Sequence, residues 1–558
     1  MLTRCALALM GILSMASASA GDAVFREVRY AGDDDGPPID TTQFRNPVVA
    51  GFYPDPSAIR VGDDFYLVTS TFGYFPGLPI FHSTDLVSWT QIGNAIHRPG
   101  QIDYGDKEEL TRGLFAATLA HHDGTLYIAN TCFYCDRGNF VVTAKHPAGP
   151  WSDPIWLGVS GIDPSLFFDD DGSAWVVHND VPDGKLRYDG HRAVWLQRFD
   201  FDRRERVGER ILLVDGGADP STNPEHVEGP HIFKHDGWYY LTAAEGGTGE
   251  QHAQMVWRSR TLTGPYAAFP GNPSLTQRDL DPKRADPVTS TGHAQFVQLK
   301  DGSWWAVFLA TRPYRGNQYN LGRETFLLPV TWQDGWPVIL PRGERVPVVV
   351  KRPDLPRNPQ PLPTTGPIEW TERFDAPALP LSWMTLHPPK TRWYTTGAQG
   401  LALSPGAMPL GGFGATPGQP SYVAHRLQHH NATLETTIAS FDPAPGELAG
   451  LALIQNEYGH YVLGVERDAR GGLAVSLYRR SSRDGAKEGE RLARIPLDAN
   501  AMPITLRFRL DGPRLDADYA LASGEWISVA SGLDASLLSA DKAGGFIGNT
   551  FGPYAVRR

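Results

Sequence analysis

Short apolar segments separated by tight polar turns recur along the first two thirds of the chain. In Val227–Ala244, an apolar segment ends at an Asp236-Gly237 turn and an aromatic segment follows. Two extended segments around an Asp-Gly turn are typical of a β-hairpin. The same pattern predicts five hairpins in all, at residues 55–71, 115–130, 163–178, 227–244 and 293–309.

The predicted hairpins follow one another at a fairly regular interval. Their turns carry Asp63, Asp123, Asp171, Asp236 and Asp301, which lie roughly 50 to 65 residues apart with further strand-like sequence between them. A repeated hairpin at this spacing is typical of a β-propeller with one sheet per repeat. No long segment has the 3.6-residue period of a helix, so we expect little helix.

The pattern changes after the repeats, which we assign to a propeller domain at residues 45–349. Residues 350–367 are proline-rich and predict a stiff linker. From 368 to 558 apolar and polar positions alternate at period two, which predicts a β-sandwich with either a structural or a carbohydrate-binding role. Its clearest predicted strands are Leu434–Ser440, Leu451–Gln455, Tyr461–Glu466, Ala474–Tyr478 and Thr505–Leu510.

The first 44 residues contain two different segments. Residues 1–20 combine an early basic residue, an apolar core and a small-residue end, which predicts a signal peptide and a secreted or periplasmic protein. The apolar run is too short for a membrane span, and no later stretch is long and apolar enough to be one. Residues 21–44 contain an acidic, proline-containing run and predict a loosely ordered arm.

Charge and cysteine content exclude some functions. The net charge of −11 and the lack of a long basic run argue against nucleic-acid binding. Cys132 and Cys135 remain once the signal peptide is removed, and an oxidising compartment permits a disulfide between them. A local disulfide and two free thiols both stay open, whereas a zinc site would need a second pair of ligands.

The repeat also supplies a register for candidate catalytic residues. The residues eight positions before the turn aspartates are Asp55, Phe115, Asp163, Glu228 and His293. Equivalent positions in propeller blades surround the axis, so three carboxylates and a histidine are predicted to converge there. Asp before Pro is also a common turn residue. Like charges around one axis cost stability, however, which favours a functional role for the set.

Glycoside hydrolysis requires an acid at the leaving oxygen and a base or nucleophile on the opposite face of the sugar. Beyond this match of chemistry, the chain resembles glycoside hydrolase family 43, with the β-xylosidase and α-L-arabinofuranosidase members the most similar. Six segments in order carry the resemblance: NPVVAGFYPDPSAIRVGDDFYLV, SGIDPSLFFDDDGSAW, EGPHIFK, AEGGT, TGHAQFVQ and LGRETFLLPVTWQDGWPVI. It covers residues 46–349, and the C-terminal sandwich resembles the jelly-roll, concanavalin-like domain of these enzymes.

The resemblance implies an all-β protein with a five-bladed propeller and an inverting reaction. Asp55 would be the general base that activates water, and Glu228 the general acid. Asp163 would orient Glu228 and raise its pKa by like-charge proximity. An inverting pair of carboxyl groups is about 6.5–9.5 Å apart, which leaves room for the water.

The resemblance also implies a substrate-binding set. Arg323 would contact substrate hydroxyls, Phe72 and Phe115 would wall the first subsite, and His293 would lie below the sugar. Position 115 is Trp in some members, so the Phe here affects sugar preference. No cofactor is required, but His293 would adjoin a calcium ion held mostly by water.

A glycine-rich segment near the end of the chain, Lys542–Ala555, resembles the one that brings an aromatic side chain to the pocket mouth in some members. Thr550 occupies the matching position here, with Phe551 next to it. The sequence therefore predicts that this aromatic is displaced or that the pocket closes less tightly.

The leading hypothesis is an exported, exo-acting hydrolase of xylo-oligosaccharides or arabinoxylan side chains. Its partner is an oligosaccharide or polysaccharide substrate. Two alternatives stay open: a glycan-binding propeller without activity, and a five-bladed fructosidase. The fructosidase would need Asn-Asp-Pro-Asn and Arg-Asp-Pro motifs, where this chain has Tyr-Pro-Asp-Pro-Ser and Gly-Ile-Asp-Pro-Ser.

Overall fold

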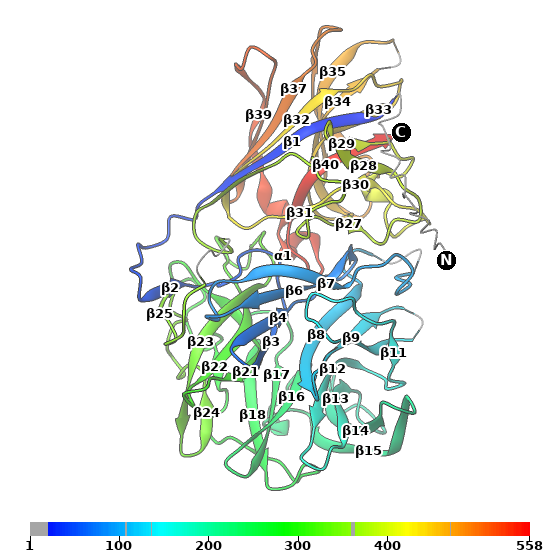
Figure 1. Cartoon of the computed structure of the whole chain (residues 1–558). Coiled ribbons are helices and arrows are strands. Elements are labelled where there is room, and N and C mark those ends of the chain that lie inside the picture. The colour runs from blue at the N-terminus through cyan, green and yellow to red at the C-terminus, as the bar shows by residue number, and fades with distance from the viewer. Residues whose placement is uncertain (1–20, 106–108, 136, 359–362, 469) are drawn as a thin grey trace, which may run out of the picture.

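A computed structural model describes residues 21–105, 109–135, 137–358, 363–468 and 470–558. Two β-rich domains are packed one on the other, with the blue-to-green domain below the yellow-to-red one in Figure 1. In the described residues the only α-helix is α1 (Ala540–Ala543), which confirms the low helix content. None of the described helices is long and apolar enough to cross a bilayer. The predicted signal peptide lies outside the described residues.

The first domain is a five-bladed propeller, as predicted. Each blade is an antiparallel sheet whose first two strands are one of the predicted hairpins. Blade 1 contains β3 (Ser57–Val61), β4 (Asp64–Val68), β6 (Gly77–Ser83) and β7 (Thr90–Ile96). Blade 2 contains β8 (Gly113–His122), β9 (Thr125–Phe133), β10 (Asn139–Ala144) and β11 (Ile155–Trp156). Blade 3 contains β12 (Ile162–Phe168), β13 (Ala174–Asp180), β14 (Ala193–Asp200) and β15 (Glu205–Asp215).

Blade 4 contains β16 (Glu228–His235), β17 (Trp238–Glu245), β18 (Ala253–Ser259) and β19 (Ala267–Ala268), with β20 (Leu275–Thr276) also paired to β18. Blade 5 contains β21 (Thr289–Gln298), β22 (Trp304–Thr311), β23 (Glu324–Gln333) and β24 (Trp336–Val338). The first strands of successive blades contact one another in a closed ring, β3, β8, β12, β16 and β21. These strands therefore surround the axis, and their N-terminal ends carry the predicted register residues.

A short pair of strands joins the two ends of the propeller. β2 (Gln43–Arg45) pairs with β25 (Val349–Lys351). The predicted linker at 350–367 thus begins inside a strand. Its later part packs against the propeller, because the Thr364 carbonyl accepts the N–H of Ala50 at 2.8 Å.

The C-terminal domain is a sandwich of two antiparallel sheets around an apolar core. One sheet has the order β28-β29-β1-β32-β37-β38-β39, with β26 on β1, and the other β30-β40-β33-β34-β35-β36, with β31 on β40. The five predicted sandwich strands are confirmed as β32 (Asn431–Ser440), β33 (Glu447–Asn456), β34 (Gly459–Arg467), β35 (Leu473–Arg480) and β37 (Ile504–Asp511). The others are β26 (Ile368–Glu372), β28 (Tyr394–Gly397), β29 (Gly400–Leu403), β30 (Ser421–Tyr422), β31 (His425–Arg426), β36 (Glu490–Pro496), β38 (Arg514–Ala520), β39 (Trp526–Asp534) and β40 (Thr550–Arg557).

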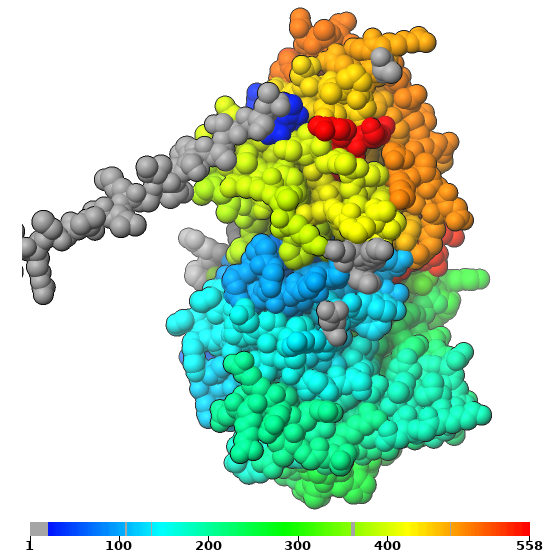
Figure 2. Space-filling model, turned by 90° about the vertical axis from the view of Figure 1, so that its right-hand side faces the viewer, coloured from blue at the N-terminus to red at the C-terminus, as the bar shows by residue number. Residues whose placement is uncertain are grey.

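The expectation of a loosely ordered arm at residues 21–44 is wrong for its first half. β1 (Ala23–Gly32) lies inside the sandwich, between β29 and β32. Its side chains Phe25, Val28 and Tyr30 are buried in the sandwich core. In Figure 2 the dark blue atoms accordingly lie among the yellow and red atoms of this domain. The acidic run after β1 dominated the composition of the segment and masked its apolar positions.

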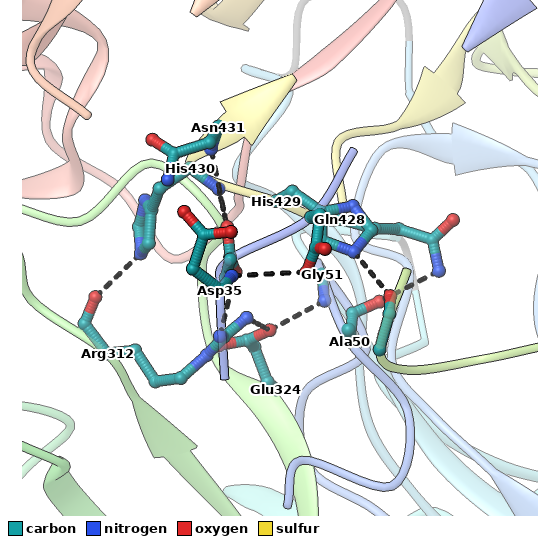
Figure 3. Close-up of polar contacts among 12 residues, drawn as sticks. Asp35, Ala50, Gly51, Arg312, Glu324, Gln428, His429, His430 and Asn431 are labelled. Atoms are coloured by element: carbon teal, nitrogen blue, oxygen red, sulfur yellow. Dashed lines mark hydrogen bonds and ion pairs between the residues drawn. The ribbon is translucent and has the colours of Figure 1, made fainter. Parts of the chain in front are cut away.

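A buried polar cluster joins the two domains (Figure 3). Arg312 makes two hydrogen bonds to the Glu324 carboxylate, at 2.7 and 2.9 Å, and a third to Asp34 at 2.9 Å. The Glu324 carboxylate also accepts the Gly51 N–H at 2.8 Å. From the sandwich, His430 hydrogen-bonds the Arg312 carbonyl at 2.9 Å. Glu324 is the first residue of β23, so the cluster also fixes the position of Arg323, the residue before Glu324.

Replacing Arg312 by Met is expected to destabilise the protein by about 3 kcal/mol. Glu324 is fully buried, and burial already raises its pKa while Arg312 opposes that effect. Without the guanidinium, the carboxylate would remain buried without its charged partner. Thermal and urea unfolding of Arg312→Met should show the loss. Arg315→Met is the matched control, since Arg315 is exposed and, among the described residues, its guanidinium hydrogen-bonds only the Gln318 side chain. Equal unfolding midpoints for the two variants would contradict the prediction.

Candidate active site

Four of the five axial strands lose their regular pairing at the same level. The breaks lie between Leu114 and Ala117 in β8, Ile162 and Ser165 in β12, Glu228 and His231 in β16, and Gly292 and Gln295 in β21. A bulge leaves a residue out of the ladder and re-aims its side chain. Each predicted register residue in blades 2 to 5 lies at or beside such a break.

Three of the register residues also have a strained backbone. Asp55, Asp163 and His293 have φ values of 52°, 55° and 54°. This left-handed region is uncommon for residues other than glycine, and such strain is often retained at functional sites. The backbone here has been bent to direct these side chains toward the axis.

The structure brings all seven predicted site residues into one cavity of about 520 Å³. They are Asp55, Phe72, Phe115, Asp163, Glu228, His293 and Arg323. A larger groove of about 690 Å³ lies on the sandwich. Its charged side chains include Arg509 and Asp516, which pair with each other at 3.1 Å, so we place the candidate site in the propeller.

Asp55 is held by two side chains. Its Oδ1 accepts a hydrogen bond from Arg323 Nη1 at 2.7 Å, and its Oδ2 accepts one from the Ser70 hydroxyl. Asp55 is only 4% exposed. Both carboxylate oxygens are therefore oriented, and a cation lies directly beside them.

Asp163 is positioned by the strand that carries Glu228. Its Oδ2 accepts the Gly229 N–H at 3.1 Å and lies 3.5 Å from His293 Nε2. Position 229 must be glycine, because φ is 58° and a Cβ there would lie 2.5 Å from the His293 ring. Glycine thus allows the blade 4 strand to approach Asp163 closely.

Glu228 lies in an environment that favours its protonated form. Burial, followed by the charge of Asp163, raises the pKa of Glu228 to about 7, against the opposing effects of His293 and Arg323. Its nearest described histidine is His252, whose Nε2 lies 3.9 Å from Glu228 Oε1. Burial lowers the pKa of His252 to about 3, so this ring is neutral and adds no charge to oppose protonation. Glu228 can therefore hold and release a proton near neutral pH.

The carboxylates around His293 favour its protonated form. Burial opposes its charge, but the hydrogen bond to Asp163 and the charges of Asp55, Asp163 and Glu228 raise the pKa of His293 to about 9. Calcium prefers oxygen ligands, so an ion beside this single imidazole would be held mainly by water. No group of three or more His, Cys, Asp or Glu in the described ranges is arranged to hold a metal. The water-held calcium ion that the resemblance implies beside His293 therefore stays a prediction.

Aromatic side chains form one wall of the cavity. The rings of Phe72 and Phe115 lie 5.1 Å apart, and each lies 6.2 Å from the ring of Phe546. Phe546 comes from the sandwich and lines the cavity, and its carbonyl accepts a hydrogen bond from Arg323 Nη2 at 3.3 Å. The sandwich thus supplies part of the propeller's pocket.

The aromatic side chain that the sandwich brings to the cavity is therefore Phe546, which lies four residues before the expected position, Thr550. Thr550 and Phe551 begin β40, and Phe551 is fully buried beside Tyr30. Close approach of backbones explains the shift: a Cβ on Gly548 would lie 2.4 Å from the Leu321 carbonyl oxygen. The flanking glycines in AGGFIG were the signal that could have identified Phe546. The sequence offered no comparable signal for His252, Phe133 or Arg112, which also adjoin or line the cavity.

The family model for glycosyl hydrolases family 43 matches residues 44–337. The chain belongs to this family. The match confirms the resemblance and identifies this family 43 protein as a glycoside hydrolase. The matched residues correspond to the propeller. A second model, the beta xylosidase C-terminal Concanavalin A-like domain, matches residues 371–558.

Relatives match the family 43 protein over nearly its whole length. A "Xylosidase/arabinosidase" of Butyrivibrio fibrisolvens is 38% identical, covering 91% of this chain and 95% of the relative. A non-reducing end alpha-L-arabinofuranosidase of Bacteroides ovatus is 36% identical, covering 92% and 91%. The crystal structure of a GH43_12 retrieved from a capybara gut metagenome matches with a TM-score of 0.89 and 34% identity, covering 97% and 100%.

Proposed function

We propose that this glycoside hydrolase is an exported, inverting, exo-acting enzyme. It removes β-D-xylosyl or α-L-arabinofuranosyl units from xylo-oligosaccharides or arabinoxylan side chains. The observation that carries the proposal is a pair of carboxyl groups in one pocket with opposite electrostatic environments. Asp55 adjoins the Arg323 cation, whereas burial and Asp163 raise the pKa of Glu228 to about 7. We therefore give Asp55, the ionised carboxylate, the role of base and Glu228, the protonated carboxyl, the role of acid.

In the proposed reaction Asp55 removes a proton from a water molecule, whose oxygen attacks the anomeric carbon. The bond to the leaving oxygen breaks as Glu228 gives that oxygen its proton. One bond forms and one breaks on opposite faces, so the anomeric configuration inverts. Asp163 orients the Glu228 strand and keeps Glu228 protonated.

Arg323 and His293 are proposed to donate hydrogen bonds to the bound sugar. Both are buried, and the Nε of Arg323 has no hydrogen-bond partner among the described residues. Phe72, Phe115 and Phe546 would pack against the sugar ring. Because the sandwich closes one side of the pocket through Phe546, we propose that it admits a chain end, which gives exo cleavage. The names of the relatives support the choice of xylose and arabinose.

Export is proposed from the predicted signal peptide and from a disulfide between Cys132 and Cys135. Disulfides persist mainly in oxidising compartments. N-terminal sequencing of protein recovered outside the cytoplasm would test this, with a mature chain that begins near Gly21 as the expected result.

The function is tested with nitrophenyl β-D-xylopyranoside and nitrophenyl α-L-arabinofuranoside. We expect release of nitrophenol from at least one of them, and proton NMR during the first minutes should show the product with inverted anomeric configuration. A product with retained configuration would refute the roles given to Asp55 and Glu228. Binding of xylo-oligosaccharides without turnover of any glycoside would instead favour a glycan-binding propeller.

The pH profile depends on Asp163. If Glu228 must be protonated to act, kcat/KM falls as pH rises through its pKa of about 7. Asp163→Asn removes a negative charge that raises this pKa, so the alkaline limb of the profile should move to lower pH. Asp170→Asn is the control, since this exposed carboxylate lies on the same hairpin outside the cavity. An unmoved alkaline limb in Asp163→Asn would show that Asp163 does not tune the acid.

A further inference from the structure

A row of aromatic rings leads from the bottom of the cavity to the protein surface. The rings of Phe72 and Phe115 are 5.1 Å apart, those of Phe115 and Phe133 are 4.6 Å apart and stacked, and those of Phe133 and Tyr134 are 4.6 Å apart and perpendicular. Exposure rises along the row, from 2% for Phe72, through half-buried Phe115 and Phe133, to 60% for Tyr134. A substrate unit beyond the sugar at Asp55 would therefore meet Phe133 and Tyr134.

One arginine lies over the outer end of this row. The guanidinium carbon of Arg112 is 5.4 Å from the centre of the Phe133 ring and 4.9 Å from that of Tyr134. Arg112 and Phe133 both line the cavity. Within the described ranges the guanidinium has no hydrogen bond or ion pair, whereas Arg323 pairs with Asp55. Arg112 thus brings a positive charge to the pocket wall, and its described electrostatic neighbour, the Glu109 carboxylate, is itself paired with Arg483 at 2.7 Å.

A second arginine adds to this charge. Arg192 lines the same cavity, and the only described hydrogen bond of its guanidinium goes to the carbonyl of His191, at 2.9 Å. The nearby carboxylate of Asp180 is already paired with Arg210 at 3.0 Å. In a chain of net charge −11, this wall is therefore locally positive.

The position of Arg112 is fixed from both domains. The residue before it, Thr111, accepts the N–H of Phe546 at 2.9 Å, and Leu110 donates its N–H to Glu457 of the sandwich at 3.4 Å. On the other side, the Cys132–Cys135 disulfide closes the turn that carries Phe133 and Tyr134. These restraints fix the backbone next to Arg112 and next to the two rings before any ligand binds, which reduces the entropy lost on binding.

We propose that Arg112, Phe133 and Tyr134 form a subsite for a hexuronic acid carried on the leaving-group side of the substrate. The proposal rests on the proposed function, which places the reacting sugar at Asp55 and Glu228. The rings would pack against the C–H face of the leaving sugar, and Arg112 would pair with the uronate carboxylate in the planar geometry that arginine favours. The enzyme would then cleave a bond faster when the leaving sugar carries a uronic acid than when it carries none.

The test compares two oligosaccharides that differ only in a glucuronic acid on the sugar next to the cleaved bond, together with a nitrophenyl glycoside that is too short to reach Arg112. Arg112→Gln should lower kcat/KM about tenfold on the acidic oligosaccharide and leave the other two substrates within twofold. Arg137→Gln is the matched control, because it removes a positive charge from the segment that follows Phe133 and Tyr134. Arg137 is exposed, lies near Trp156 and does not line the cavity. Added salt should weaken the preference of the unmodified enzyme for the acidic substrate.

Two results would overturn the proposal. Equal losses on acidic and neutral oligosaccharides would mean that Arg112 does not select a uronate, and unchanged values on both would mean that it binds neither. Calorimetric binding of the acidic oligosaccharide to Glu228→Gln, with and without Arg112→Gln, needs no turnover. If no glycoside is cleaved but this binding weakens about tenfold without Arg112, the proposed function fails and the subsite stands.

Discussion

Glu228→Gln is expected to lower kcat on an unactivated disaccharide such as xylobiose about a thousandfold or more. Glutamine keeps the shape of the side chain but cannot transfer a proton to the leaving oxygen. A nitrophenolate leaves largely without that proton, so kcat on the nitrophenyl glycoside should fall far less. The alkaline limb near pH 7 should also disappear, because the pKa that produces it belongs to Glu228.

The two readouts for Glu228→Gln are kcat on each substrate and the pH profile of kcat/KM. Glu457→Gln is a suitable control, since burial raises the pKa of Glu457 to about 7 as well, but this carboxyl lies in the sandwich and does not line the cavity. Equal losses on both substrates would refute an acid role for Glu228.

Asp55→Asn is expected to lower kcat by at least a thousandfold on the disaccharide and the nitrophenyl glycoside alike. The base acts on water, and that step is needed whatever the leaving group. The asparagine oxygen can still accept the hydrogen bond from Arg323, and its NH2 group can donate to the Ser70 hydroxyl oxygen, so the pocket should keep its geometry. Only the capacity to take a proton is lost.

The comparison of Asp55→Asn with Glu228→Gln is the decisive measurement, made at a pH below 7 where Glu228 is protonated. Circular dichroism and thermal unfolding of Asp55→Asn should match the unmodified protein. If Asp55→Asn spared the nitrophenyl glycoside while Glu228→Gln did not, the two roles would be exchanged.

The hairpin register predicted which residues line the candidate cavity, because it depends on local sequence. A turn aspartate and an alternating strand fix where each blade begins, so Asp55, Asp163, Glu228 and His293 could be aligned without a structure. The bulges and positive φ angles that direct these side chains left little trace in the sequence beyond Gly229.

Contacts between distant segments could not be predicted in this way. Phe546 reaches the cavity because Thr111 and Arg323 hydrogen-bond its backbone, and both lie more than 200 residues earlier. Arg112 and Phe133 become neighbours only when β8 and β9 pair. β1 was missed for the same reason, since its partner β32 is encoded about 400 residues later, and the acidic run that follows β1 masked its apolar positions.

The place of β1 in the sandwich has a consequence for how the protein is made. Synthesis proceeds from the N-terminus, so this strand is made before the propeller, while its partners β26, β29 and β32 are translated only after the whole propeller. Until then its apolar side chains have no partner sheet. A fragment that starts at residue 368 would likewise lack the strand between β29 and β32, leaving two open sheet edges prone to aggregation. The two domains are therefore separate in structure but cannot be separated by cutting the chain once.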